Sequence, residues 1–177
     1  FPTKEDLVLA VVDHIGESFE GEIFGGALTP VADPIDRVFA VLESYRRHLD
    51  DNDFALGSPL GTLAAELSTS HPQVRERLAE LFAGWTDRMQ FLLEEAGDRL
   101  PADLDRRGLA EFLLSAVEGA VLQSRAGRSL TPFDSTMTEL RRHLGRLESN
   151  RRQAATPENR PRPAPAARHS AVDWRAW

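Results

Sequence analysis

The chain has 177 residues, of which 41% are apolar and none is cysteine. It can therefore form one domain with a substantial core, but no disulfide, thiolate metal site or cysteine nucleophile. Residues 151–177 have six arginines against two acids, a net charge of +4, which leaves −11 for residues 1–150. An acidic body is a poor surface for nucleic acid. No apolar run is long enough to cross a bilayer.

The first helix is predicted to run from about Lys4 to near Phe24 and to stop at Gly25-Gly26. Thr3, followed three residues later by Asp6, is a weak variant of a capping box, in which the hydroxyl accepts from the first-turn amides. The buried face of this helix is expected to carry the apolar residues that recur at helical spacing, namely Leu7, Val8, Val11, Val12 and Ile15.

Three further helices begin where a proline follows a polar residue, a pattern typical of a first helical turn. They are predicted from Pro34, capped by Asp33, to about Asp50, from Pro59, preceded by Ser58, to near Leu67, and from His71-Pro72 to about Gly97.

The fifth helix is predicted from about Leu104 to Arg125 and is rich in small residues. The sixth is expected to have Thr131 as its cap and Pro132 as its first residue. Its apolar residues form a narrow seam at spacings of three or four, namely Phe133, Met137, Leu140, Leu144 and Leu147. Since no segment alternates as a strand does, the sequence predicts an all-α bundle of about six helices.

Past about Gln153 the chain is rich in proline and arginine, and nothing there could offset the entropy of ordering by burial. We interpret residues 151–177 as a Pro/Arg-rich tail, separate from a domain of residues 1–150. The tail is either an inert linker or a functional latch or DNA-contacting arm, since Trp174 and Trp177 invite docking.

Several motifs resemble TetR-type bacterial transcription regulators. The opening Phe1-Pro2-Thr3-Lys4-Glu5-Asp6-Leu7 is similar to the junction at which the fourth helix of that family begins. A ligand-domain signature of one subgroup is matched by Gly57, Ser58, Pro59, Gly61, Leu63 and Glu66. An aromatic pair and a later helix are matched by Phe82 and Trp85, and by Ala110, Phe112, Leu113, Glu118, Gly119 and Ala120. The resemblance covers about Phe1 to Leu147.

The resemblance implies a TetR-type C-terminal helical bundle that binds a ligand and forms a homodimer. Residues 1–24 would be the linker helix to a helix-turn-helix domain lying immediately before Phe1, and Lys4 would contact DNA phosphate. A solvated surface lysine is the alternative for Lys4, which is the only lysine in the chain.

Two subunits would pair through the last two helices as a four-helix bundle. Small residues permit close helix approach, and the sixth helix offers an apolar surface that one thin bundle is expected not to bury alone. The predicted interface comprises Leu109, Phe112, Leu113, Ala116, Gly119, Ala120, Gln123, Phe133, Met137, Leu140 and Leu144.

A small apolar or amphipathic effector is expected to bind among the first five helices. The predicted lining is Phe39, Leu42, Leu60, Leu63, Phe82, Trp85, Met89, Val117 and Val121, with Tyr45, Gln90 and Glu118 as polar contacts. Any single member of this set is more typical of ordinary core than of a ligand contact, and only the set as a whole indicates a pocket. For Glu118 a buried ion pair and a ligand anchor are both open.

The sequence favours a cytoplasmic, ligand-responsive regulator, namely a repressor released from operator DNA by its effector, with no membrane partner and no cofactor. No histidine has the i, i+4 partner of a helical metal site, and Ser58 lacks the motif context of a nucleophile, so no metal site and no enzyme is predicted. The alternatives are a helical sensor or interaction module that never binds DNA and, more weakly, a small-molecule-binding bundle with catalytic activity.

Overall fold

The computed structural model describes residues 1–25 and 31–155. Over these residues it contains α1 (Lys4–Glu20), the π-helical turn η1 (Gly21–Gly25), α2 (Pro34–Asp51), α3 (Pro59–Leu67), α4 (Pro72–Glu95), the 3-10 turn η2 (Gly97–Arg99), α5 (Arg106–Gly127) and α6 (Thr131–Ala155). The prediction of an all-α fold with six α-helices is confirmed. Most of the predicted tail, residues 156–177, lies outside the described residues.

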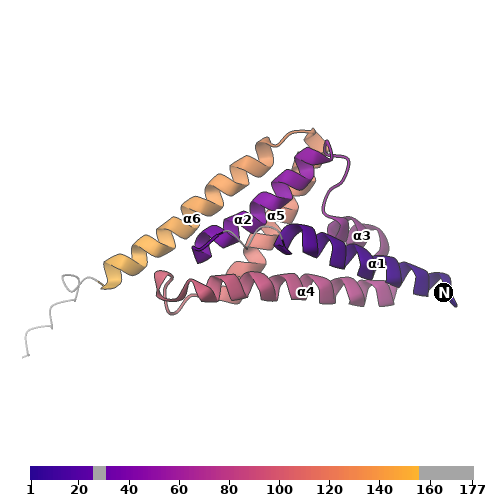
Figure 1. Ribbon diagram of the computed structural model, residues 1–177, viewed down its shortest axis with the longest axis horizontal. Coiled ribbons are helices and arrows are strands. Elements are labelled where there is room, and N and C mark those ends of the chain that lie inside the picture. The colour runs from indigo at the N-terminus through magenta and orange to yellow at the C-terminus, as the bar shows by residue number, and fades with distance from the viewer. Residues whose placement is uncertain (26–30, 156–177) are drawn as a thin grey trace, which may run out of the picture.

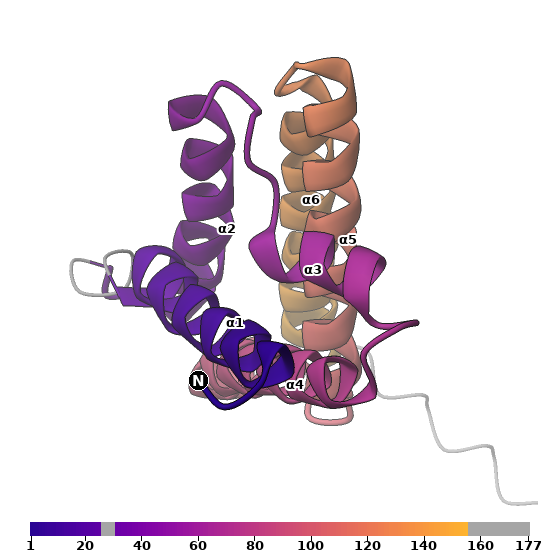
Figure 2. The same cartoon turned by 90° about the vertical axis from the view of Figure 1, so that its right-hand side faces the viewer.

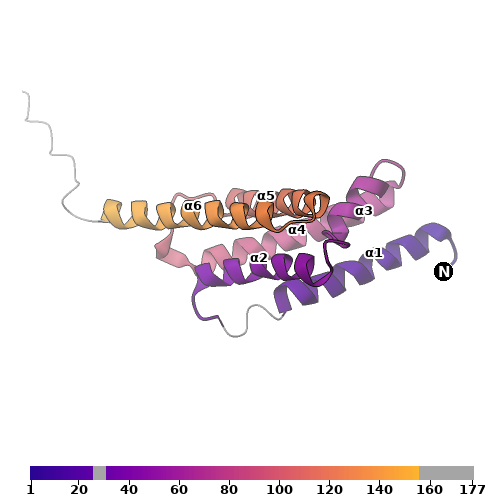
Figure 3. The same cartoon turned by 90° about the horizontal axis from the view of Figure 1, so that it is seen from above.

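Helix α4 organises the bundle, since α1, α2, α3 and α5 all pack against it. Figure 1 shows α1 and α4 along one edge, with α2, α5 and α6 rising obliquely from them. In Figure 2, α5 and α6 lie side by side and α2 stands apart from them, while the short α3 crosses in front of α5. The view from above places the start of α1 and the end of α6 at opposite ends of the molecule (Figure 3).

Local capping signals set the helix starts. Thr3 and Asp6 form a reciprocal capping box, because the Asp6 amide donates to Thr3 Oγ1 at 3.1 Å and the Thr3 amide donates to Asp6 Oδ2 at 3.0 Å. Asp33 Oδ1 accepts from the Ile35 amide at 2.9 Å. Ser58 Oγ accepts from the Gly61 amide at 3.2 Å. These caps are the ones that the sequence predicts.

Two helix termini differ from the predictions. The first α-helix ends at Glu20, short of Phe24, and the chain continues as the wider turn η1, which leaves Ile23 and Phe24 in the core at 0% and 4% exposure. Thr131 does not cap the sixth helix; it is the first residue of α6, and its amide donates to the Ser129 hydroxyl at 3.2 Å. A hydroxyl two residues earlier therefore supplies the cap.

The apolar seam of α6 is buried within one chain. Phe133, Met137, Leu140 and Leu144 are each at most 7% exposed, in the same core cluster as residues of α5, against which α6 packs. The expectation that one bundle leaves this seam uncovered is wrong. It assumed too thin a bundle, whereas α5 and the core of the same chain cover the seam. No described helix is long and apolar enough to cross a membrane.

Candidate functional site

The predicted effector pocket is largely occupied by its own side chains. Trp85 of α4 is 1% exposed and lies at the centre of an aromatic cluster, with ring centroids 5.9 Å from Phe82, 6.4 Å from Tyr45 and 6.5 Å from Phe24. Burial raises the pKa of Tyr45 well above its ordinary value, and the nearby Glu118 carboxylate adds to the rise. The sequence correctly places Tyr45, Phe82 and Trp85 together, although it did not include Phe24, and these rings fill the space between the helices.

The other predicted lining residues fall into three groups. Fully buried core positions are Phe39, Leu42, Leu60, Met89, Val117 and Val121, while Leu63 and Phe82 are partly buried against the same cluster. Glu118 lies beside a cavity, as described below. Gln90 is separate: its side-chain amide donates to Glu94 Oε1 at 2.8 Å, and its oxygen accepts from Arg107 at 3.3 Å, both exposed hydrogen bonds.

A cavity of about 470 Å³ lies between α3 and α5, and we call it the α3–α5 cleft. Its walls are formed by Gly57, Ser58, Gly61, Thr62, Ala65, Glu66, Glu118, Gly119, Val121, Leu122 and Arg125. Ser58 and Val121 are buried, whereas Leu122 and Arg125 are exposed, so the cleft leads inward from the surface. Gly61 makes room for it, because a Cβ atom there would lie 2.6 Å from Glu118 Oε2.

Glu118 is the unusual residue of this cleft. Its Oε1 atom is buried without a hydrogen-bond partner among the described residues. Desolvation raises the pKa of the Glu118 carboxyl above its ordinary value, and a hydrogen bond from the Ser58 side chain opposes the rise. Of the two roles left open by the sequence, the buried ion pair is not found in the described part of the chain, since no cation contributes to this pKa. The anchor role stays open.

Replacing Glu118 with glutamine is expected to raise the free energy of unfolding at neutral pH by about 1 kcal/mol. Because the folded-state pKa is raised above the ordinary 4.5, the folded protein binds the Glu118 proton more tightly than the unfolded chain does. The wild type therefore gains stability as the pH falls through the folded-state pKa towards 4.5, and the advantage of E118Q should shrink over that window. Urea denaturation at neutral and mildly acidic pH measures this.

The control for this experiment is E66Q, which removes an exposed carboxylate from the same cleft and should change stability little. An E118Q advantage that stays constant, or that grows on acidification, would contradict the assignment of Glu118 as a desolvated acid.

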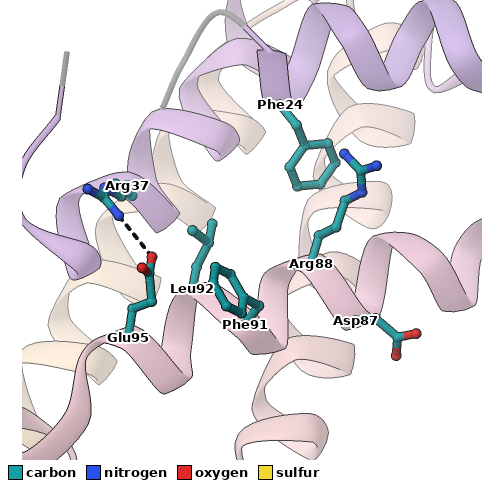
Figure 4. Close-up of a pocket in the computed structure, with 7 residues that line it drawn as sticks. All are labelled: Phe24, Arg37, Asp87, Arg88, Phe91, Leu92 and Glu95. Carbon is teal, nitrogen blue, oxygen red and sulfur yellow. Dashed lines mark hydrogen bonds and ion pairs between the residues drawn. The ribbon is translucent and has the colours of Figure 1, made fainter. Parts of the chain in front are cut away.

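A second cavity, of about 550 Å³, lies between α2 and α4. Figure 4 shows the Arg37–Glu95 ion pair, 2.8 Å long, on one side and Arg88 beside Phe24 on the other, with Phe91 and Leu92 between them and Asp87 pointing away. The Arg88 guanidinium carbon lies 5.6 Å from the Phe24 ring centroid. Apart from Leu92 and Phe24, its lining is mostly exposed, and none of the predicted lining residues borders it.

The predicted dimer residues divide by exposure. Leu109, Leu113, Ala120, Phe133, Met137, Leu140 and Leu144 lie in the core of one chain. Phe112 is 51% exposed, its ring centroid is 6.0 Å from that of His143 on α6, and Ala116, Gly119 and Gln123 continue the same face of α5. Leu122, 67% exposed, belongs to this outer face but was not predicted. Its spacing of three residues from Gly119 on the same helix was the available signal.

Lys4 lies exposed at the start of α1, where the sequence places it. One helical turn apart on the same helix, Leu7 and Val11 are 46% and 44% exposed. The sequence predicted both as buried, so α1 has an apolar strip that the described chain covers only in part.

Residues 34–139, more than half of the chain, match the family of C-terminal domains of LmrA/YxaF-like transcriptional regulators. The chain belongs to the TetR family of transcriptional regulators. It is 28% identical over 151 residues to an HTH-type transcriptional regulator of Mycobacterium tuberculosis, covering 80% of this chain and 71% of that protein. TetR-family members are regulators rather than enzymes, and they typically dimerise and bind DNA.

Solved structures of TetR-family proteins have the same fold. A TetR transcriptional regulator from Chloroflexus aurantiacus is 26% identical with a TM-score of 0.74, covering 82% of this chain and 74% of that one. Regulatory protein TetR from Rhodobacter sphaeroides is 25% identical with a TM-score of 0.71, covering 82% and 76%. The family and the six-helix fold that the motifs implied are thus confirmed.

Proposed function

We propose that this TetR-family protein is a repressor whose affinity for operator DNA falls when a small molecule binds in the α3–α5 cleft. The observation that carries the proposal is Glu118, a half-buried residue at the wall of the cleft whose carboxylate Oε1 is buried without a partner in the described chain. An unsatisfied buried acceptor costs stability, and a ligand that satisfies it recovers that cost. The cavity between α2 and α4 offers a ligand only polar groups that are exposed or already paired.

Helix α3 supplies the route from the cleft to the DNA-binding side. It forms one wall of the cleft through Ser58, Gly61 and Thr62, and it also packs against α1 and α4. A ligand that enters between α3 and α5 acts on α1 through α3. It shifts the conformational equilibrium only by the difference between its affinities for the two states.

The residues that read DNA are proposed to precede Phe1. Leu7 and Val11 give a helix-turn-helix domain an apolar strip to pack against, and Lys4 lies where a phosphate contact is possible. In the homodimer two such domains must lie about 34 Å apart to enter successive major grooves. The exposed face of α5, beside α6, is proposed as the dimer contact. Action on operator DNA places the protein in the cytoplasm.

Replacing Gly61 with leucine is expected to fill the cleft and to weaken effector binding by at least about tenfold. The added side chain begins 2.6 Å from Glu118 Oε2, inside the space that the ligand would use. A thermal-shift screen of the wild type identifies stabilising compounds, and each is then titrated against the variant.

Gly84→Leu is the matched control, because it makes the same change in α4 at a position where an added Cβ meets nothing within 4 Å. Compounds that stabilise the wild type and G61L equally would show that they bind elsewhere and would overturn the assignment of the cleft.

A further inference from the structure

We propose that the effector is an apolar molecule carrying a protonated nitrogen, which pairs with Glu118 at the inner end of the α3–α5 cleft. The proposal rests on the function inferred above and names the chemical class of its ligand. It follows from the acceptor, the apolar side chains and the charges that line the cleft.

The buried part of the cleft lining includes one acceptor without a partner in the described chain. Glu118 Oε1 is buried and unpaired within the described chain, while the Ser58 side chain hydrogen bonds the carboxylate. An ionised carboxylate can only accept, so its free oxygen requires a donor. A protonated nitrogen suits this carboxylate better than a neutral donor, because its positive charge offsets the desolvation that disfavours the ionised form.

The remainder of the cleft favours an apolar body. Val121 and Leu122 contribute aliphatic side chains, while Gly57, Gly61 and Gly119 expose backbone without bulk. A cavity of about 470 Å³ is within the range of small-molecule sites. A ligand with one aromatic or aliphatic group and one polar end fits this division.

The charge of the cleft favours a cation over an anion. Its lining has two carboxylates, those of Glu118 and Glu66, and one guanidinium, that of Arg125. Arg125 is exposed at the rim, where its Nη1 lies 3.5 Å from Thr62 Oγ1. An anion drawn to Arg125 would still have Glu118 on its inner side, and the body of the protein, residues 1–150, carries −11.

The test uses three probes with one carbon skeleton and different charge: 4-phenylbutylamine, 4-phenylbutanol and 4-phenylbutyrate. Isothermal titration of the complete protein should show the amine binding at least about tenfold more tightly than the alcohol, and the carboxylate most weakly. In E118Q the advantage of the amine should fall to about twofold or less, because the charged partner is gone. Glu76→Gln, which removes an exposed carboxylate of α4 that lies outside the cleft, should retain it.

E118Q loses a desolvated charge and keeps its shape, so it is expected to fold; circular dichroism checks this before titration. If the alcohol or the carboxylate binds best in the wild type, or if E118Q leaves the preference for the amine intact, the cation proposal is overturned while the cleft remains the effector site. If no probe binds the wild type, or if G61L binds all three as well as the wild type does, both proposals are overturned.

Discussion

A variant with both Phe112 and Leu122 replaced by glutamate is expected to be a monomer at micromolar concentration, where the wild type is a dimer. The two side chains are 51% and 67% exposed on α5, and Ala116 and Gly119 lie between them with little side-chain bulk. A two-fold contact through this face would bury four carboxylates without cationic partners. Since each such buried charge costs several kcal/mol, dimer affinity should fall by more than about 100-fold.

Sedimentation equilibrium or multi-angle light scattering measures this directly. The control is Phe91→Glu, which places the same charge at a residue of α4 that is 58% exposed and lies outside the proposed contact face. Phe91→Glu should remain a dimer. If the double variant is also dimeric, then α5 does not form the contact and another surface must.

Replacing Trp85 with alanine is expected to lower the free energy of unfolding by about 4 kcal/mol. The indole is 1% exposed and contacts the rings of Phe24, Tyr45 and Phe82, so its loss removes apolar contacts from η1, α2 and α4 together. These three elements cannot collapse into a space of that size without moving the helix axes, because interiors are close-packed.

Urea denaturation at one fixed protein concentration gives the change, since unfolding of a dimer depends on concentration. Phe91→Ala, which truncates an exposed aromatic residue of the same helix, should cost less than about 1 kcal/mol. A loss of similar size in both variants would mean that Trp85 is not the packing centre of the bundle.

The helix starts could be predicted because their signals are local. Thr3, Asp33 and Ser58 each cap the helix that the sequence assigned to them, and each followed from residues within one turn. The π-helical turn of η1 could not be predicted in this way. It depends on Ile23 and Phe24 reaching a core formed by helices that are distant in the sequence. The residue pattern of α1 carries no information about the position of those helices.

The candidate site was predictable in outline only. An apolar stripe shows that a residue points inward, but not whether it meets another side chain or a cavity, which is why Trp85 and Met89 were assigned to a pocket and are packed in the core. Glu118 stood out because a charge amid apolar residues is unusual. The cleft itself depends on Gly57 and Gly61 approaching α5, which requires the tertiary structure.

The apolar seam of α6 illustrates the same difficulty. Its spacing correctly identified a buried face, but burial within one chain and burial in a dimer produce the same periodicity. Phe133 and Leu144 are 0% and 1% exposed in the single chain, so the dimer contact must use other residues. Of the exposed residues of α5, Phe112 was already part of the predicted interface, and Leu122 is what the structure adds.

The most direct measurement is the operator affinity of the complete regulator, by fluorescence anisotropy, with and without a compound that stabilises the wild type. The account predicts that the compound weakens operator binding by the wild type at least about tenfold and leaves G61L bound to DNA at the same concentration. Unchanged DNA affinity of the wild type, or equal release of wild type and G61L, would contradict the claim that the α3–α5 cleft controls DNA binding.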